Sequence, residues 1–326
     1  MTSILGSSHN EQVLFFDPGC ASLNLGDEII SDSASRYLLP LFSNKYVVRL
    51  STHQKVSIRY GRYLRDSYAG FVLGSNLLKS GMLFGFRQWD ISIVNSLQIA
   101  DLVLVGCGWQ NYTSKVGLYS RLLYKRLLSK HYMHSVRDEY TKQKLEYIGF
   151  KNVINTGCPT LWALTPEHCS AIPRTKSSMV VTTVTDYRRD PVRDRIMLEE
   201  LFRSYESVYV WIQGSSDIEY LKQLELSNHY YIVPPSLCEF DKLVSNNTDI
   251  EYVGTRLHGG IRCLQHGRRA IIISIDNRAR EMSRDYGLPI LEREDINLLH
   301  DLIGTDFDID IKIDSDAIDQ FLSQFD

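Results

Sequence analysis

The sequence predicts an α/β protein with two doubly wound parallel-sheet domains, and three observations lead to this fold class. Short β-branched apolar runs alternate with longer helical patterns along the chain. The length of 326 residues suits two domains. Residues 165–178 carry two prolines and no apolar period, so they divide the pattern into two halves. We therefore expect Rossmann-like domains over residues 1–168 and 175–326.

The elements of each half follow from the spacing of apolar residues. In the first half we expect strands at residues 13–16, 46–50, 70–73, 101–105, 133–136 and 153–155, and helices at 27–42, 116–130 and 139–148. In the second half we expect strands at 179–184, 208–212, 230–233, 250–253 and 270–273, and helices at 192–205, 217–226, 237–245, 259–265 and 278–286. Alternating Asp and apolar residues at 306–313 predict an edge strand. A last helix at 315–325 is a candidate to pack back on the N-terminal domain.

Composition excludes several classes of protein. The 36 Lys and Arg residues and 39 Asp and Glu residues give a net charge of −3, which argues against a nucleic-acid partner. The six cysteines include no CxxC pair, and no His, Asp and Cys cluster suggests a metal, so we expect reduced thiols and no metal site. No apolar run approaches the ~18 residues that span a bilayer, and the first ten residues do not resemble a secretory signal. We expect a cytoplasmic protein.

Ligands of open parallel sheets bind beyond the carboxyl ends of the strands, so the residues after each strand are the candidate site. Asn24, Gly26 and Asp27 follow the first strand, and Asp27 is either a helix N-cap or a functional carboxylate. Gly106 and Gly108 follow the fourth strand, where they permit either the approach of a ligand or a tight turn. None of these runs fits GxGxxG or GxxxxGK[ST], so a nicotinamide or P-loop protein is disfavoured.

Two further strands of the first half end in reactive residues. Arg137 and Asp138 begin a predicted helix, where Arg opposes the helix dipole unless an anion or carboxylate lies beside it. The alternative is a weak surface pair between Arg137 and a neighbouring acid. Cys158 is better explained as a buried thiol than as a nucleophile, because nothing supplies its base.

The second half contains the strongest candidate for a ligand site. The strand at 250–253 leads to Arg256, His258 and Gly259 at a helix N-terminus. Free amides, the positive dipole end, a guanidinium and an imidazole together favour a phosphate or carboxylate, and the alternative is a His258 satisfied within the core. Asp186 and Arg278 follow two other strands of this half, beside charged neighbours. Two Rossmann-like domains with a ligand in the cleft between them are typical of GT-B transferases.

Two basic stretches require a separate interpretation. Residues 59–65 place Arg62 between tyrosines and are a candidate groove for an acceptor sugar. Residues 120–130 form a basic amphipathic helix, which either rests on an anionic membrane or simply covers the sheet.

Taken in order, five segments resemble the polysaccharide pyruvyl transferase family. They are the Asn-Leu-Gly-Asp run at 24–27, residues 100–108, Val-Arg-Asp at 136–138 with Thr141 and Leu145, Gly-Cys-Pro at 157–159, and Val-Gly-Thr-Arg-Leu-His-Gly at 253–259. The resemblance spans nearly the whole chain, and Arg-Leu-His-Gly is its most specific part. It departs from the family at Cys107, where a Gly is expected, and at Arg278, where a Lys is expected.

The resemblance implies a GT-B-like fold, phosphoenolpyruvate as the donor substrate, and no cofactor. It also implies transfer of a pyruvyl ketal to a saccharide, with a lipid-linked acceptor and peripheral membrane contact among the options, during surface polysaccharide assembly. Arg137, Arg256 and His258 match the family's basic residues around the donor, and Arg278, with Gly259, completes the expected donor-binding set. For the chemistry we expect His258 to transfer a proton to the methylene carbon or to the leaving phosphate, and Asp27 or Asp138 to accept the proton of a sugar hydroxyl.

Two other function classes stay open. A GT-B glycosyltransferase would place the diphosphate of a nucleotide sugar at the same helix N-terminus. A sugar- or nucleotide-binding protein without turnover would keep the fold, although the presence of both Arg256 and His258 argues against it. Binding of phosphoenolpyruvate or of a nucleotide separates the two enzyme classes.

Overall fold

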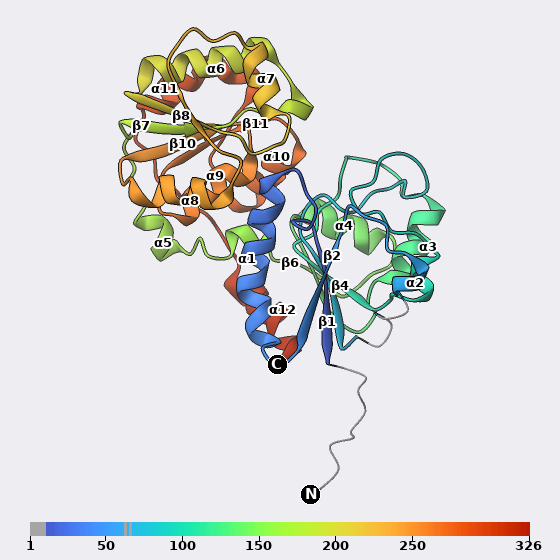
Figure 1. The fold of residues 1–326 in the computed structure, drawn as a ribbon. Helices are drawn as coiled ribbons and strands as arrows, with labels where there is room; N and C mark the ends of the chain where they lie inside the picture. The colour runs from blue at the N-terminus through green and yellow to red at the C-terminus, as the bar shows by residue number, and fades with distance from the viewer. Residues whose placement is uncertain (1–10, 62–63, 65–66) are drawn as a thin grey trace, which may run out of the picture. The chain divides into compact units, whose positions relative to one another are not determined.

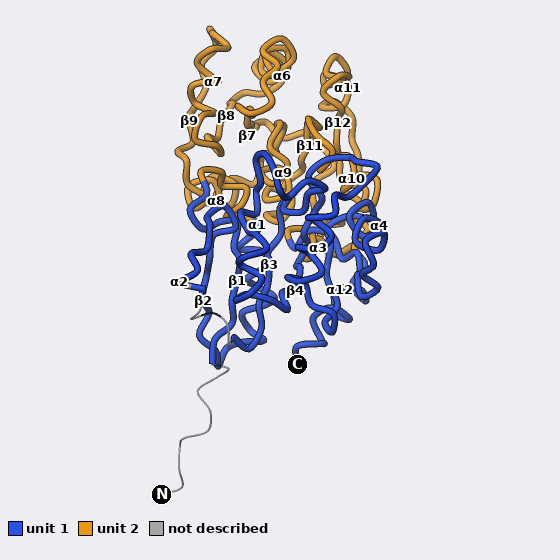
Figure 2. Tube along the Cα trace, turned by 90° about the vertical axis from the view of Figure 1, so that its right-hand side faces the viewer, with its two compact units in different colours: residues 1–22, 30–159, 314–326 blue, residues 23–29, 160–313 orange. Residues whose placement is uncertain are grey.

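The chain forms two compact units, each with its own parallel sheet. The computed structural model describes residues 11–61, 64 and 67–326 (Figure 1). Unit 1 takes the chain up to residue 22 together with residues 30–159 and 314–326, and unit 2 takes residues 23–29 and 160–313 (Figure 2). The last helix is thus grouped with unit 1, and the segment of Asn24 is grouped with unit 2. No local pattern in the sequence indicates the second of these assignments.

The chain passes between the units at Pro159 and Thr160. The segment expected to be a linker, 165–178, contains the short helix α5 (Pro166–Ser170). Thr165 caps this helix by accepting a hydrogen bond from the His168 N–H, and the first helical residue is a proline. The five residues of α5 are too few to show an apolar period, so the sequence pattern predicted a loop here.

The sheet of unit 2 has the Rossmann strand order, β12-β11-β10-β7-β8-β9, with every neighbouring pair parallel. Its strands are β7 (Met179–Thr182), β8 (Ser207–Trp211), β9 (Tyr231–Val233), β10 (Ile250–Gly254), β11 (Ala270–Ser274) and β12 (Ile290–Glu292). The chain runs outward from β7 to β9 and then returns to β10 on the other side of β7. This reversal creates a switch point between the carboxyl ends of β7 and β10.

Helices cover both faces of this sheet. The helices α6 (Pro191–Ser204), α7 (Asp217–Gln223) and α11 (Leu299–Gly304) lie on one face, and α8 (Leu237–Asn246) and α9 (Leu257–Gln265) lie on the other (Figure 1). Helix α10 (Asn277–Tyr286) follows β11 in the same unit. A doubly wound layer of this kind requires strands buried on both faces, and β10 and β11 are buried at every position.

Unit 1 contains a four-stranded parallel sheet of order β2-β1-β3-β4, which β5 and β6 continue. Its strands are β1 (Gln12–Asp17), β2 (Tyr46–Ser51), β3 (Ala69–Leu73), β4 (Leu102–Val105), β5 (His134–Val136) and β6 (Val153–Asn155), and its helices are α1 (Leu25–Leu41), α2 (Ile58–Gly61), α3 (Leu118–Leu127), α4 (Glu139–Tyr147) and α12 (Ser315–Leu322). The continuation rests on a parallel bridge between Cys107 and Val136. From residue 30 onward α1 lies with α12 on one face, and α3 and α4 lie on the other (Figure 1).

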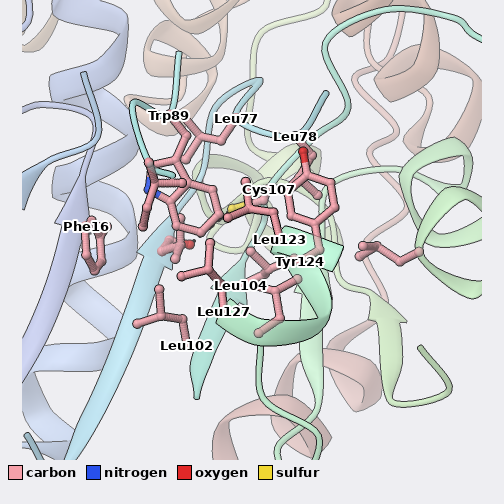
Figure 3. Packing of buried hydrophobic residues seen from close by; sticks show 14 of the residues in the cluster. Phe16, Leu77, Leu78, Trp89, Leu102, Leu104, Cys107, Leu123, Tyr124 and Leu127 are labelled. Atoms are coloured by element: carbon pink, nitrogen blue, oxygen red, sulfur yellow. Dashed lines mark hydrogen bonds between the residues drawn. The ribbon is translucent and has the colours of Figure 1, made fainter. Parts of the chain in front are cut away.

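Alternation along β1 divides the core of unit 1 between the two faces of the sheet. Phe16 packs in the cluster that includes Leu123 and Tyr124 of α3 (Figure 3). Its neighbour Phe15 meets Phe71 on the opposite face, edge to face at 5.8 Å between ring centroids. Successive residues of a strand point to opposite faces of the sheet, so β1 contributes side chains to the core on both sides.

The predicted fold class is confirmed: the protein is α/β with a doubly wound parallel sheet in each unit. The two Rossmann-like domains that the GT-B prediction requires are therefore both present. The edge strand predicted at 306–313 is wrong. Ile309 and Ile311 are buried, which explains the alternation, but the segment makes only isolated backbone bonds, such as Lys312 N–H to the Tyr286 carbonyl at 2.9 Å. Alternation reports side-chain burial, and it does not require a strand partner.

One buried histidine joins β4 to β5, the strand that leads to Arg137. The Leu104 N–H donates to Nδ1 of His134 at 3.2 Å, and Nε2 of His134 faces the Ser129 carbonyl at 2.9 Å. The ring must therefore be neutral, with its proton on Nε2. Burial lowers the pKa of His134 to about 4, against a smaller opposing effect of the Ser129 carbonyl.

We predict that acid destabilises unit 1 through His134. Because the folded-state pKa of about 4 lies below the ordinary 6.5, the contribution is complete above pH 6.5 and is lost as the pH falls toward 4. Between pH 7.5 and 5 the free energy of unfolding should fall by about 2 kcal/mol more in the wild type than in His134→Gln. Urea unfolding at both pH values measures this difference, and equal pH dependence in the two proteins would refute it.

Candidate functional site

Arg256 lies at the switch point of the unit 2 sheet, where open α/β sheets bind ligands. It follows β10, is the N-cap residue of α9, and is 3% exposed. Its Nη2 donates to Oδ1 of Asp186, a residue that follows β7, at 2.9 Å. Its backbone N–H donates to Oγ1 of Thr183 at 3.1 Å. The guanidinium is therefore held where the two strands on either side of the switch point end.

Asp217, the first residue of α7, is the buried partner of this guanidinium. Its Oδ2 accepts hydrogen bonds from Arg256 Nε at 3.2 Å and from the Gly214 N–H at 2.7 Å, and its Oδ1 accepts from Arg256 Nη2 and from the Asp186 N–H. Burial raises the pKa of Asp217, and the adjacent guanidinium opposes this rise. One carboxylate thus links the loops that follow β7, β8 and β10.

Arg256 keeps one nitrogen for a ligand. Asp186 and Asp217 occupy Nη2 and Asp217 also occupies Nε, whereas Nη1 has no hydrogen-bond partner within the described part of the chain and is not fully buried. The ring of Tyr187 lies over the guanidinium, with its centroid 5.0 Å from Cζ. Tyr187 is itself 51% exposed, so the guanidinium lies beneath an accessible aromatic ring.

A second arginine, Arg278, shares the ring of Tyr187. Its Nη2 hydrogen-bonds the Tyr187 hydroxyl, and its Cζ lies 6.0 Å from the ring centroid. Asp276, the N-cap residue of α10, accepts from Arg278 Nε at 3.0 Å and from Nη2 at 2.6 Å. The loops that follow β10 and β11 therefore bring two guanidinium groups, those of Arg256 and Arg278, to the ring of Tyr187.

The segment of Asn24 joins this site from the other end of the sequence. The Leu25 N–H donates to the Gln213 carbonyl and the Ser215 N–H donates to the Leu23 carbonyl, both at 3.0 Å. Asn24 forms an antiparallel bridge with Gly214, and its Oδ1 accepts from the Gly26 N–H at 3.2 Å. Asn24 therefore caps α1. The alternative reading of Asp27 as the N-cap is wrong, because Asp27 lies inside the first turn.

Gln213 lies between the N-termini of two helices. A Cβ on Gly26 of α1 would lie 2.8 Å from its Nε2, and a Cβ on Gly259 of α9 would lie 3.1 Å from its Oε1. The neighbours of these glycines, Asp27 and His258, are 8% and 4% exposed. The N-termini of two helices thus meet at one carboxamide.

The Gln213 side chain is incompletely satisfied. Its Nε2 donates to Oδ1 of Asn24 at 3.1 Å. Its Oε1 is buried and accepts no hydrogen bond from the described residues. A buried acceptor without a partner costs free energy, about 1–3 kcal/mol. Such atoms persist most readily at sites where a ligand supplies the missing donor.

The glycines of α9 serve packing. A Cβ on Gly259 would lie 3.2 Å from Cε2 of Tyr252, and one on Gly260 would lie 2.5 Å from Cγ1 of Ile272. Both positions face the sheet. These glycines allow α9 to approach β10 and β11 closely. The donor-binding role predicted for Gly259, whose Cβ would also lie 3.1 Å from Oε1 of Gln213, stays a prediction.

In unit 1, Arg137 and Asp138 follow β5 and are each 1% exposed. Asp138 Oδ2 accepts from Arg137 Nη2 at 3.0 Å, and its Oδ1 caps α4 by accepting from the N–H and hydroxyl of Thr141 at 2.8 and 2.6 Å. Both carboxylate oxygens are thus occupied by structural hydrogen bonds. Nη1 of Arg137 is buried with no partner in the described part of the unit, so it retains a donor for an anion.

The Gly-Cys-Gly run after β4, residues 106–108, packs closely against Pro159 and Arg137. Gly106 has φ +63°, and a Cβ there would lie 2.2 Å from Cδ of Pro159. A Cβ on Gly108 would lie 2.3 Å from Nη2 of Arg137. Cys107, at the position that departs from the family pattern, is buried, and burial raises its pKa to about 12. Gly106 thus serves a tight turn, and Gly108 leaves room for the Arg137 guanidinium. The approach of a ligand to these glycines stays a prediction.

Arg62 and Cys158 were also singled out in the sequence. Arg62 lies outside the described residues. Cys158 is fully buried, as a small packed thiol should be. Across residues 11–61, 64 and 67–326, no three His, Cys, Asp or Glu side chains gather as a metal site requires. None of the described helices has the length and apolar character needed to cross a membrane.

Sequence reasoning missed the central members of the site. Gln213, Asp217 and Tyr187 each follow a strand that was predicted, so the strand-end rule was able to find them. Their single-residue signals are weak, since Asp at a helix start and Gln before Gly are common in turns. Asp276 was visible only as a neighbour of Arg278.

The fold and the site define an α/β protein of the Rossmann-like class, with arginines, a histidine and carboxylates gathered at a switch point. A sequence profile described as polysaccharide pyruvyl transferase matches residues 24–277. The chain belongs to the polysaccharide pyruvyl transferase family. No curated protein sequence matches it significantly.

Several solved structures are similar to the chain over most of its length. A UDP-GlcNAc 2-epimerase from Neisseria meningitidis, bound to UDP-GlcNAc, has 14% identity and a TM-score of 0.47, covering 90% of this chain and 89% of that one. A second UDP-N-acetylglucosamine 2-epimerase has 14% identity and a TM-score of 0.48, covering 96% and 89%. The lipopolysaccharide outer core galactosyltransferase WaaB has 8% identity and a TM-score of 0.47, covering 96% and 95%.

We predict that Gly214→Ala damages the site. The added Cβ would lie 2.2 Å from Nη2 of Arg256 and 3.2 Å from Oδ1 of Asp217, so it must displace the buried ion pair. Thermal or urea unfolding should show a loss of about 2 kcal/mol, as overpacking generally causes. Gly304→Ala is the matched control, because no atom lies within 4 Å of its Cβ position. Equal effects of the two substitutions would contradict the packing described here.

Proposed function

We propose that the protein transfers the pyruvyl group of phosphoenolpyruvate to a saccharide, forming a pyruvate ketal during assembly of a surface polysaccharide. Membership of the pyruvyl transferase family supports the reaction class. The observation that carries the proposal is the convergence of the N-termini of α1 and α9 on Gln213, beside Arg256 and His258. Positive helix ends and a guanidinium suit a donor that carries both a phosphate and a carboxylate.

In this proposal the donor's anionic groups bind the free edge of Arg256 and the guanidinium of Arg278. Arg256 Nη1 has no hydrogen-bond partner among the described residues and so is available to the donor, and the Tyr187 ring lies over the guanidinium. Asp186 is the competing anion. It binds the same guanidinium, but its side chain is 24% exposed, so an incoming phosphate or carboxylate can take its place. Asp217 is fully buried and stays, which keeps Arg256 in position.

The first chemical step adds a sugar hydroxyl to the donor. His258, as the imidazolium, gives its proton to the methylene carbon of phosphoenolpyruvate while the hydroxyl oxygen bonds to the adjacent carbon. Asp27 takes the proton of that hydroxyl. The guanidinium groups hold the carboxylate and phosphate in place and stabilise the charge that develops on the phosphate as it leaves in the second step. Asp27 is the acceptor of choice because it belongs to the same unit as Arg256 and His258, whereas Asp138 belongs to unit 1.

The second step closes the ketal. A second hydroxyl of the same sugar bonds to the same carbon as the bond to the phosphate oxygen breaks. The proton of this hydroxyl returns to His258, and the proton held by Asp27 leaves with the phosphate. Both side chains thus regain their starting states, and the products are the cyclic ketal and inorganic phosphate.

We predict that phosphoenolpyruvate binds the wild-type protein and binds His258→Ala at least about tenfold more weakly, because the imidazole lies beside the proposed phosphate position. Titration calorimetry at low salt measures both affinities, with UDP and GDP as control ligands. If a nucleotide binds and phosphoenolpyruvate does not, the donor assignment is wrong and a nucleotide-sugar glycosyltransferase becomes the working function.

We predict opposite effects for the two carboxylates on Arg256. Asp186→Asn removes a competing negative charge and should tighten phosphoenolpyruvate binding severalfold, about 1 kcal/mol. Asp217→Asn removes the buried partner and should weaken binding and lower the melting temperature. The same titration compares the variants, with circular dichroism to verify folding. Weaker binding in Asp186→Asn would show that the donor does not replace this carboxylate.

A further inference from the structure

A loop of unit 1 holds apolar side chains in solvent. Leu83, Phe84 and Phe86 are 50%, 79% and 74% exposed, although each would gain free energy by burial. Lys79 lies under the turn, and its Nζ donates to the carbonyls of Phe84 at 3.4 Å and Phe86 at 2.8 Å. The backbone of this loop is therefore tied down while its aromatic rings stay accessible. A concentration of exposed apolar side chains generally marks an interaction surface.

The loop begins beside the first turn of α3. The Gly117 N–H donates to the Ser80 carbonyl at 2.9 Å, and the Met82 N–H donates to Oγ of Ser120 at 2.8 Å. In the same part of α3, Leu118 is 83% exposed and Leu122 is 54% exposed. These two leucines are four residues apart, so they share one side of the helix.

The other side of α3 covers the sheet. Leu123, Tyr124 and Leu127 are fully buried in the core cluster (Figure 3). The sequence alternatives for this basic helix were a sheet-covering role and a membrane contact. The buried side of α3 has the sheet-covering role. The exposed Leu118 and Leu122 form a second side that is available to another partner.

Positive charge is concentrated around these apolar groups. Residues 67–137 contain eight Lys and Arg residues and two Asp residues, in a chain whose net charge is −3. Two surface hollows of about 390 and 500 Å³ both include Lys125 and Lys130, and Lys151 lines the larger. None of these three lysines forms an ion pair with a described residue. Their charges are available to an external anion.

We infer that this surface, formed by the loop at 79–87, helix α3 and the lysine hollows, docks on an anionic lipid bilayer. The aromatic rings and leucines would enter the interfacial region, and the lysines would contact the phosphates of the headgroups. We prefer a bilayer to a folded partner because exposed apolar side chains occur together with lysines that form no ion pair with a described residue, the combination that binds anionic lipid surfaces; one carboxylate, Asp101, also lines the smaller hollow. The inference goes beyond the proposed function and does not depend on the donor.

Flotation of the full-length protein with lipid vesicles tests the inference. The protein should float with phosphatidylcholine vesicles that contain phosphatidylglycerol and remain behind with phosphatidylcholine alone or at high salt. The double variant Phe84→Ser/Phe86→Ser and the double variant Lys125→Gln/Lys130→Gln should each reduce binding about tenfold. All four residues are exposed, so unchanged melting temperatures are expected and are measured alongside.

The matched control is Leu298→Ser, which removes a 55% exposed leucine from unit 2 and should bind vesicles like the wild type. Absence of binding to anionic vesicles, equal binding of the wild type and the Phe double variant, or equal binding to neutral vesicles would each overturn the inference. A dimer in analytical ultracentrifugation that the Phe variant abolishes, without vesicle binding, would instead identify a contact between two copies. No phosphoenolpyruvate is present, so the result is independent of the donor chemistry.

Discussion

The buried ion pair between Arg256 and Asp217 is the constraint on which the site of unit 2 depends. Removing two charges from water costs several kcal/mol per ion, and the cost is offset only when their remaining hydrogen-bonding groups are also satisfied. Asp217 achieves this with the backbone amides of Gly214 and Asp186 as well as with the guanidinium. The same requirement that neutralises the charge therefore fixes the three loops at the switch point.

The second constraint is the contact between segments 189 residues apart, Asn24 and Gln213. It brings the N-terminus of α1 to the edge of a sheet that is otherwise formed by residues after 160. Without it Gln213 would meet one helix N-terminus, from α9, and the unit would lack Asp27. The tight fit at Gly26 makes this contact specific, because any side chain there would displace the Gln213 carboxamide.

The strand-end rule predicted where the site lies better than it predicted what each residue does. Arg256, His258, Asp186 and Arg278 all fall at the carboxyl edge of the unit 2 sheet, as expected. Their partners Asp217 and Gln213 also follow a predicted strand, but their single-residue signals are weak because both residue types are ordinary in turns. Gly259 and Asp138 were predicted to serve a ligand, and the contacts that the structure shows for them are those of helix packing and helix capping. A local pattern identifies a residue that is unusual for its position, but several long-range contacts can account for it.

By itself the sequence determined the α/β class, the order of nearly all strands and helices, and the segments that match the pyruvyl transferase family. These depend on apolar periodicity and short motifs, which are properties of neighbouring residues. Only the tertiary structure decided that Asn24 joins unit 2, that Asp186 and Asp217 share Arg256, and that Ile309 and Ile311 are buried without forming a strand. Such facts depend on distances between residues far apart in the chain. Those distances are set by the packing of whole sheets and helices, which no local pattern encodes.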